Sequence, residues 1–166
     1  MTVTCVTSAR YAAKRGHMDR RDYAWFGAQL VLFVAALAAP IVQRSPVHPL
    51  VRVLGIGMLG AGGTIAAAAY RALGASHSPW STPLDGGRLV TSGIYRQVRH
   101  PIYLGWCLAS VGGALLSGSL LGLAVAAALT AFYDRRARAE ERLLATRYAA
   151  YSDYVRSSSR FVPNLY

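Results

Sequence analysis

Ionisable side chains gather where a polar segment of this chain meets a long apolar one. Residues 93–105 carry five of them, and four of these form a first cluster together with a proline at the start of the apolar run: Tyr95, Arg99, His100, Pro101 and Tyr103. Histidine exchanges protons near neutral pH, tyrosine donates hydrogen bonds, and arginine holds anionic groups. Such side chains at the mouth of an apolar segment predict a functional site at a membrane boundary.

A second polar cluster follows the same apolar run. It holds three arginines and two of the seven acidic residues of the chain: Arg135, Arg136, Arg138, Glu140 and Glu141. Arg136 and Glu140 share a helix face, because they are four residues apart. Simpler structural interpretations exist for each residue alone: a surface salt bridge for this pair, a histidine before a helix-starting proline, and a belt of interfacial tyrosines.

The turn between the two clusters decides whether they meet. The apolar run 103–133 is longer than the roughly 20 residues of an ordinary span, and a Ser-Gly-Ser sequence lies at its middle, at 117–119. We therefore predict a membrane hairpin with arms over about 102–116 and 119–133, which places the clusters side by side at one membrane face. Each arm of about 15 residues reaches only ~22 Å, so the pattern leaves open whether the hairpin crosses the whole bilayer.

The composition agrees with a membrane protein. The chain has 166 residues, enough for one domain, and only 15% are charged while 54% are hydrophobic; a soluble domain carries about 25% charged residues. The net charge of +11 comes almost entirely from arginine, and beside so much apolar sequence it favours an anionic lipid surface over nucleic acid as the partner. The two cysteines, Cys5 and Cys107, show no metal-binding spacing, so neither a metal site nor a structural disulfide is expected.

Two apolar segments before the hairpin predict membrane-spanning helices over about 23–42 and 53–70. The second segment is rich in glycine and alanine, which let another helix approach closely in lipid. A short loop, 43–52, joins the two segments, and a long polar connection, 71–101, leads to the hairpin. The predicted fold class is therefore an all-α integral membrane protein.

The two ends of the chain are polar. Residues 1–22 are expected to form a basic cytoplasmic tail, and residues 23–166 a single membrane domain that ends in a cytoplasmic segment, 134–166. Within that segment, apolar residues at helical spacing predict an amphipathic helix: Leu144, Tyr148, Tyr151 and Val155. Basic residues concentrate in the tail, the long connection and the C-terminal segment, which places all three, and both termini, on the cytoplasmic side of the inner membrane.

Residues from about 89 to 163 also resemble the isoprenylcysteine carboxyl methyltransferase and phospholipid methyltransferase superfamily of integral-membrane enzymes. The resemblance rests on five runs in the expected order: 89–95, 99–106, 140–144, 148–154 and 160–163. It implies S-adenosylmethionine (SAM) as the methyl donor, bound at the cytoplasmic membrane face, and a lipophilic methyl acceptor that enters from the bilayer.

The resemblance implies roles for individual residues as well. The cofactor pocket is expected to take ten of them, with Glu140 on the ammonium group of SAM: Gly87, Arg88, Leu89, Val90, Tyr95, His100, Pro101, Ile102, Tyr103 and Glu140. The predicted catalytic residues are Arg136, near the acceptor, with Glu141 and His100. A carboxylate, as in an isoprenylcysteine or a small lipophilic acid, is the favoured acceptor because it needs no general base and Arg136 can hold it. An amine acceptor would need a base, for which Glu141 and His100 are the candidates.

Two other functions stay open. An NADPH-dependent membrane reductase of the sterol reductase group would share a similar C-terminal hairpin, and it predicts NADPH binding in place of SAM. A non-catalytic membrane scaffold would associate through the glycine-rich second helix, and it predicts that bulky side chains at Gly60 or Gly63 abolish its function. A phospholipid headgroup is an equally open acceptor, since the sequence identifies neither the acceptor nor the oligomeric state.

Overall fold

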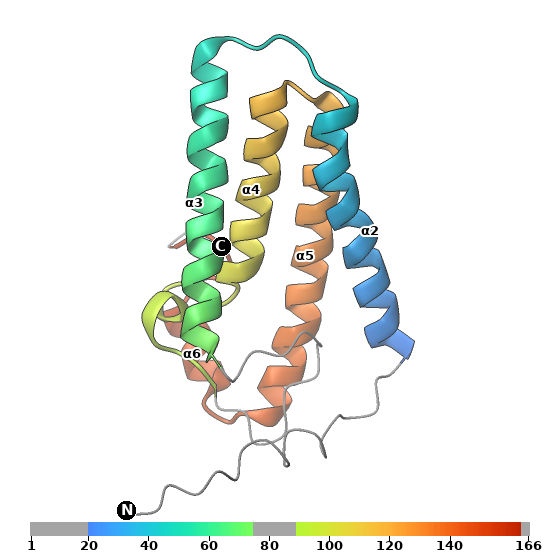
Figure 1. The fold of residues 1–166 in the computed structure, drawn as a ribbon. Coiled ribbons are helices and arrows are strands. Elements are labelled where there is room, and N and C mark those ends of the chain that lie inside the picture. The colour runs from blue at the N-terminus through green and yellow to red at the C-terminus, as the bar shows by residue number, and fades with distance from the viewer. Residues whose placement is uncertain (1–19, 75–88, 164–166) are drawn as a thin grey trace, which may run out of the picture.

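The computed structural model describes residues 20–74 and 89–163, which are mainly helical (Figure 1). In chain order the elements are α2 (Arg20–Val42), α3 (Pro49–Leu73), the 3-10 turn η2 (Gly93–Arg96), α4 (Pro101–Ser117), α5 (Leu120–Arg147) and α6 (Tyr151–Ser157). The described residues contain no strand, which confirms the all-α prediction. Helices α2 and α3 are long and apolar enough to cross a membrane, as predicted.

Both predicted spans lie in helices, which are longer than the apolar patterns alone mark. Helix α2 begins at Arg20, inside the predicted basic tail, whose residues 1–19 lie outside the described part of the chain. Helix α3 begins at Pro49, so the first loop covers only residues 43–48. Proline suits this first helical position because its missing N–H has no partner to lose there, and the Nδ1 atom of His48 accepts a hydrogen bond from the Leu50 backbone N–H at 3.3 Å.

Glycines bring α3 and α4 into backbone contact. A Cβ atom built on Gly62 of α3 would lie 2.5 Å from the carbonyl oxygen of Gly105 on α4. One built on Gly112 of α4 would lie 2.5 Å from the backbone nitrogen of Leu59 on α3. Only residues without a side chain permit so close an approach, which confirms the prediction of close packing by the second helix. The helix that α3 contacts, α4, is the first arm of the hairpin.

The hairpin turn lies where the sequence places it. Gly118 adopts a left-handed conformation with φ of 66°, and a Cβ atom there would lie 2.5 Å from the carbonyl oxygen of Ser45. The Ser45 backbone N–H donates to the carbonyl of Ser117 at 3.0 Å, and the Ser119 hydroxyl donates to the carbonyl of Ala39 at 3.2 Å. The turn therefore contacts the loop after α2, and the hairpin runs the length of the bundle to that loop.

The second arm of the hairpin continues without a break into the polar segment. Helix α5 has 28 residues, so the predicted end of the arm at residue 133 is not a helix end. Good helix formers such as Ala, Leu, Arg and Glu fill its second half. The long helix therefore carries Arg136, Glu140 and Glu141 on the same element as the second apolar arm of the hairpin.

The predicted C-terminal helix is shorter than its pattern suggests. Leu144 belongs to α5, and Tyr148 caps that helix in an extended conformation. Helix α6 then has seven residues and buries Tyr151 and Tyr154. The spacing that predicted one helix across this region therefore spans two helices and the turn between them, because apolar residues in a turn can fall on the helical period by chance.

After α6 the chain returns to the start of α4. Val98 and Ser159 form an isolated parallel bridge. The backbone N–H of Arg99 donates to the Ser159 carbonyl at 2.9 Å, and that of His100 donates to the Arg160 carbonyl at 3.1 Å. The C-terminal segment 158–161 is thereby fixed beside the first polar cluster.

The α3–α4 contact yields a first prediction. Gly62→Ala should lower the free energy of unfolding by about 1–3 kcal/mol, because the new methyl group meets backbone atoms that cannot move aside. Gly60→Ala, two residues away, is the matched control, since a Cβ atom at Gly60 has nothing within 4 Å among the described residues. Thermal denaturation in detergent measures both variants, and equal melting temperatures for the two would contradict the packing.

Candidate active site at the end of the hairpin

The hairpin brings the two polar clusters together, as predicted. We call the resulting set the Glu140–Glu141 cluster; it joins the start of α4, the second half of α5 and the C-terminal segment, and consists of Arg99, His100, Tyr103, Arg136, Glu140, Glu141 and Arg160. Hydrogen bonds and ion pairs connect all of them. Its two carboxylates have different surroundings, which gives them different chemistry.

Glu140 uses only one of its carboxylate oxygens for hydrogen bonds within the described structure. Its Oε1 atom accepts from the Tyr103 hydroxyl at 2.6 Å and from Nε of Arg136 at 3.0 Å. Its Oε2 atom lies 3.8 Å from Nδ1 of His100, beyond hydrogen-bond distance. The side chain is 18% exposed, so Oε2 can accept a hydrogen bond from a cationic ligand.

Arg136 is a buried, fixed cation beside Glu140. The residue is only 5% exposed, and its Nη1 atom donates to Oε1 of Gln29 on α2. Its guanidinium carbon lies 5.9 Å from the centre of the Tyr103 ring. Burial alone would lower the pKa of Arg136, but Tyr103 and Glu140 beside it raise that pKa above its usual value. The side chain therefore stays charged.

Gln29 is a site neighbour that sequence reasoning missed. It is the only side chain with an amide or a charge in the predicted span 23–42. A polar group of this kind inside a membrane helix is costly unless it has a partner, and here Arg136 provides one. That isolation within an apolar span was the signal that could have identified it.

Glu141 is held by two arginines. Nε of Arg99 lies 2.9 Å from its Oε1 atom, and Nη2 of Arg160 lies 2.7 Å from its Oε2 atom. Nε2 of His100 lies 3.4 Å from Oε1. Burial would raise the pKa of Glu141, but His100, Arg160 and Arg99 together lower it well below its usual range. Glu141 is therefore ionised at neutral pH and is a weak proton acceptor.

Arg99 also fixes the C-terminal segment. Its Nη1 atom donates to the carbonyl oxygen of Val155 at 3.3 Å and to that of Ser158. Arg160, which sequence reasoning did not count among the site residues, reaches both Glu141 and Asp134, the latter at 3.4 Å from Nη1. These contacts make Glu141 the point where the hairpin and the C-terminal segment are joined.

Three aromatic rings stack along the cluster. The His100 and Tyr103 rings are 5.4 Å apart and nearly parallel, and the Tyr103 and Tyr133 rings are 4.5 Å apart at 13°. His100 and Tyr133 are both buried. The stack holds the Tyr103 hydroxyl toward Glu140 and fixes the His100 ring between the two carboxylates.

The other predicted pocket residues are buried to different degrees. Tyr95 is buried in η2, where burial, with Tyr154, Tyr70 and Glu140 nearby, raises its pKa. Pro101 is fully buried as the first residue of α4. Three further residues are half-buried and keep their pocket role as a prediction: Leu89, Val90 and Ile102. Gly87 and Arg88 lie outside the described residues.

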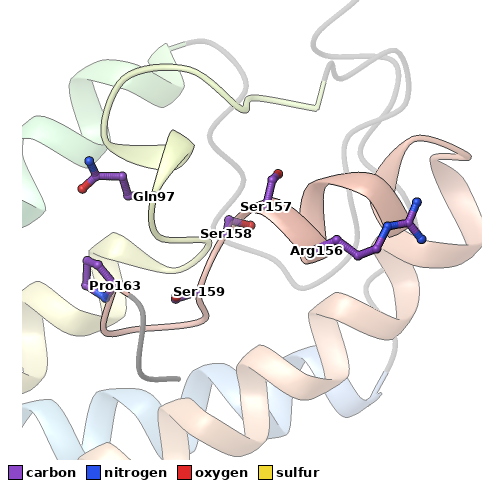
Figure 2. A pocket seen from close by; sticks show the side chains of 6 residues that line it. All are labelled: Gln97, Arg156, Ser157, Ser158, Ser159 and Pro163. Carbon is purple, nitrogen blue, oxygen red and sulfur yellow. The ribbon is translucent and has the colours of Figure 1, made fainter.

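A separate hollow opens near the C-terminal segment (Figure 2). It has a volume of about 420 Å³ and is lined by six residues: Gln97, Arg156, Ser157, Ser158, Ser159 and Pro163. None of the predicted site residues lines it. The hollow shares no residue with the Glu140–Glu141 cluster but adjoins it, because Arg99 of the cluster donates hydrogen bonds to the carbonyl oxygens of Ser158 and Ser159. No group of three or more metal-binding side chains occurs in the described parts of the chain.

A comparison of the sequence with known protein families identifies the family of this chain. The sequence profile of the phospholipid methyltransferase family matches residues 50–151, which hold α3, the hairpin and both carboxylates. The chain belongs to the phospholipid methyltransferase family. This family is part of the superfamily of the isoprenylcysteine carboxyl methyltransferases, so the predicted resemblance is confirmed. The match excludes α2, which carries Gln29, and the segment with Arg160.

Two curated relatives match 78 residues of the chain. The nickel-cobalt-cadmium resistance protein NccN of Alcaligenes xylosoxydans xylosoxydans is 35% identical, over 46% of this chain and 37% of its own. The cobalt-zinc-cadmium resistance protein CzcN of Cupriavidus metallidurans is 37% identical, over 46% of this chain and 36% of its own. The chain thus covers little more than a third of the length of these relatives.

The surroundings of Glu141 predict a pH-dependent contribution to stability. A carboxylate whose pKa is lowered by folding stabilises the fold above its unfolded pKa of about 4.3, and this contribution decreases as the pH falls below that value. Glu141→Gln should cost on the order of 3 kcal/mol at pH 7, because two half-buried arginines lose a carboxylate partner. The difference in melting temperature from the wild type should narrow between about pH 5 and pH 3.

Asp153→Asn is the control for this measurement, since the Asp153–Arg156 pair is 71–73% exposed and such pairs contribute little. The predicted role of this carboxylate would be contradicted if Glu141→Gln had the melting temperature of the wild type at pH 7. It would also be contradicted if the difference in melting temperature between the two proteins increased as the pH falls.

Proposed function

We propose that the protein transfers a methyl group from SAM to the carboxylate of a lipophilic acceptor. The observation that carries the proposal is the pairing of a partly exposed carboxylate, Glu140, with a buried cation, Arg136, at the end of an apolar hairpin. Family membership supports a membrane methyltransferase. The donor, the acceptor and the individual roles below are our proposal.

The residues present fit SAM. Oε2 of Glu140 can accept a hydrogen bond from the ammonium group, because its protein partners bind Oε1. The His100–Tyr103 stack supplies an aromatic wall that suits a sulfonium cation. SAM supplies a methyl group that its sulfonium already activates, so the protein has to bind, align and exclude water.

The electrostatics favour a carboxylate acceptor. Arg136 stays charged and can hold an anionic group by charge-assisted hydrogen bonds. An amine acceptor would have to lose a proton, and the lowered pKa of Glu141 makes it a poor base. We therefore assign Glu141 to positioning His100 and the C-terminal segment, and His100 to the wall of the site. A carboxylate acceptor requires neither residue as a base.

The distribution of basic residues supports a location in the inner membrane with both termini in the cytoplasm. In that orientation the Glu140–Glu141 cluster faces the cytoplasm, where SAM is available, while an acceptor with an apolar chain reaches the cluster from the bilayer. The loop 43–48 then faces the other side.

Calorimetry of SAM binding to the detergent-purified protein tests the donor. We expect the wild type to bind SAM and Glu140→Gln to bind at least about ten-fold more weakly, since a charged hydrogen bond is lost. Asp153→Asn, an exposed acid on α6, should bind as the wild type does. NADPH binding without SAM binding would support a reductase, and binding of neither ligand would support a scaffold.

The chemistry of the product tests the acceptor. Purified protein is incubated with methyl-tritiated SAM and one of three lipophilic probes: N-acetyl-S-farnesylcysteine, decanoic acid or phosphatidylethanolamine. A methyl ester releases volatile methanol in mild base, whereas an N-methyl group does not. We expect base-labile label on a carboxylate probe and its loss in Arg136→Leu, while base-stable label on the phospholipid would contradict a carboxylate acceptor.

A further inference from the structure

Tyr133 carries a buried hydroxyl without a partner. The residue is 0% exposed, and its hydroxyl oxygen has no hydrogen-bond partner among the described residues. Buried polar atoms in folded proteins are nearly always paired, and an unpaired one calls for an explanation. The hydroxyl could be removed by a Phe at no cost in packing, so the ring alone does not explain a tyrosine here.

The position of Tyr133 relates the hydroxyl to the site. Tyr133 precedes Arg136 by three residues on α5, so the two side chains share a helix face. Its ring stacks on Tyr103, whose hydroxyl binds Glu140. The ionisable side chains near Tyr133 are Cys107 on α4, which interacts with it most strongly, and then Arg136, Tyr70 and Glu140. Tyr133 is the last residue of the apolar arm before the charged half of α5, between the cluster and the apolar part of the bundle.

We propose that Tyr133 is an acceptor-binding residue whose hydroxyl donates a hydrogen bond to the acceptor carboxylate, beside Arg136. This inference rests on the proposed methyltransferase function and specifies its acceptor site. A carboxylate has two oxygens, and the phenol and the guanidinium together supply a donor for each. The class of ligand is therefore a carboxylic acid in its ionised form, carried on an apolar chain.

The reaction at this site balances without a proton. One carboxylate oxygen forms a bond to the methyl carbon as the bond from that carbon to the sulfonium sulfur breaks, and the electron pair of the broken bond stays on sulfur. The products are a neutral methyl ester and S-adenosylhomocysteine. Because the ester has lost its charge, its hydrogen bonds to Arg136 and Tyr133 are weaker, which favours release into the bilayer.

A matched pair of variants isolates the hydroxyl. Tyr151 also has a buried hydroxyl without a partner in the described structure, but it belongs to α6 and packs on Tyr154, outside the stack. Its charged neighbours are Glu141, Arg99 and Arg160, whereas Tyr133 lies near Arg136 and Glu140. Tyr133→Phe and Tyr151→Phe each remove one oxygen atom and keep the ring. If unpaired hydroxyls have no role in this protein, the two variants should behave alike.

The test is calorimetric titration of N-acetyl-S-farnesylcysteine and of decanoate, each with its methyl ester as a control, into protein saturated with S-adenosylhomocysteine. We expect Tyr133→Phe to weaken carboxylate binding by about 10- to 100-fold, as for the loss of a hydrogen bond to a charged group. Tyr151→Phe should bind as the wild type does, and the affinity for SAM, titrated separately, should be unchanged in both variants.

Wild-type affinity for both carboxylates in Tyr133→Phe would overturn the inference, and so would failure of the wild type to bind either carboxylate. If the wild type binds the carboxylates but not SAM, the proposed function is refuted. The carboxylate affinities of Tyr133→Phe and the wild type can still be compared in that case. Thermal denaturation checks the fold of each variant. If Tyr133→Phe does not fold, the wild type still provides a test, because binding of the methyl esters as tightly as the free acids would exclude a carboxylate site.

Discussion

The structure depends on how two adjacent carboxylates are neutralised at the end of an apolar helix bundle. Glu140 and Glu141 follow each other on α5, so they face different directions and need different partners. Arg136 and Tyr103 bind Glu140, whereas Arg99 and Arg160 bind Glu141. Buried carboxylates without such partners would be strongly unfavourable. This requirement joins α4, α5 and the C-terminal segment at one place and fixes His100 between the two acids.

The two carboxylates therefore differ in how many of their oxygens have protein partners. Both oxygens of Glu141 form ion pairs, which connect α5 to the start of α4 and to the C-terminal segment. The lowered pKa of Glu141 makes it a poor base. Only Oε1 of Glu140 accepts hydrogen bonds within the described structure, and one of them comes from the guanidinium of Arg136, which also binds Gln29 on α2. The unbroken α5 is what allows this arrangement, because it carries the membrane arm and both acids on one rigid element. Backbone contact between α3 and α4 fixes the position of His100 and Tyr103, at the start of α4, relative to α3.

Much of this arrangement could be predicted from the sequence, because it follows from periodic apolar runs and one glycine turn. The spans, the hairpin at Gly118 and the meeting of His100 with the acids are examples. The contact of Gln29 with Arg136 could not be predicted, since it depends on how α2 packs against α5 across more than 100 positions of sequence. The C-terminal helix was predicted too long because Tyr148 keeps the helical period while its backbone is extended.

The central claim is that the methyl donor binds at the Glu140–Glu141 cluster. Ultraviolet cross-linking of methyl-tritiated SAM to the purified protein, followed by peptide mapping, tests it most directly. We expect label in the fragment that begins at His100 and contains Tyr103, with loss of that label in Glu140→Gln. Label in residues 156–159, which line the neighbouring hollow, or labelling that Glu140→Gln leaves unchanged, would show that the donor binds elsewhere.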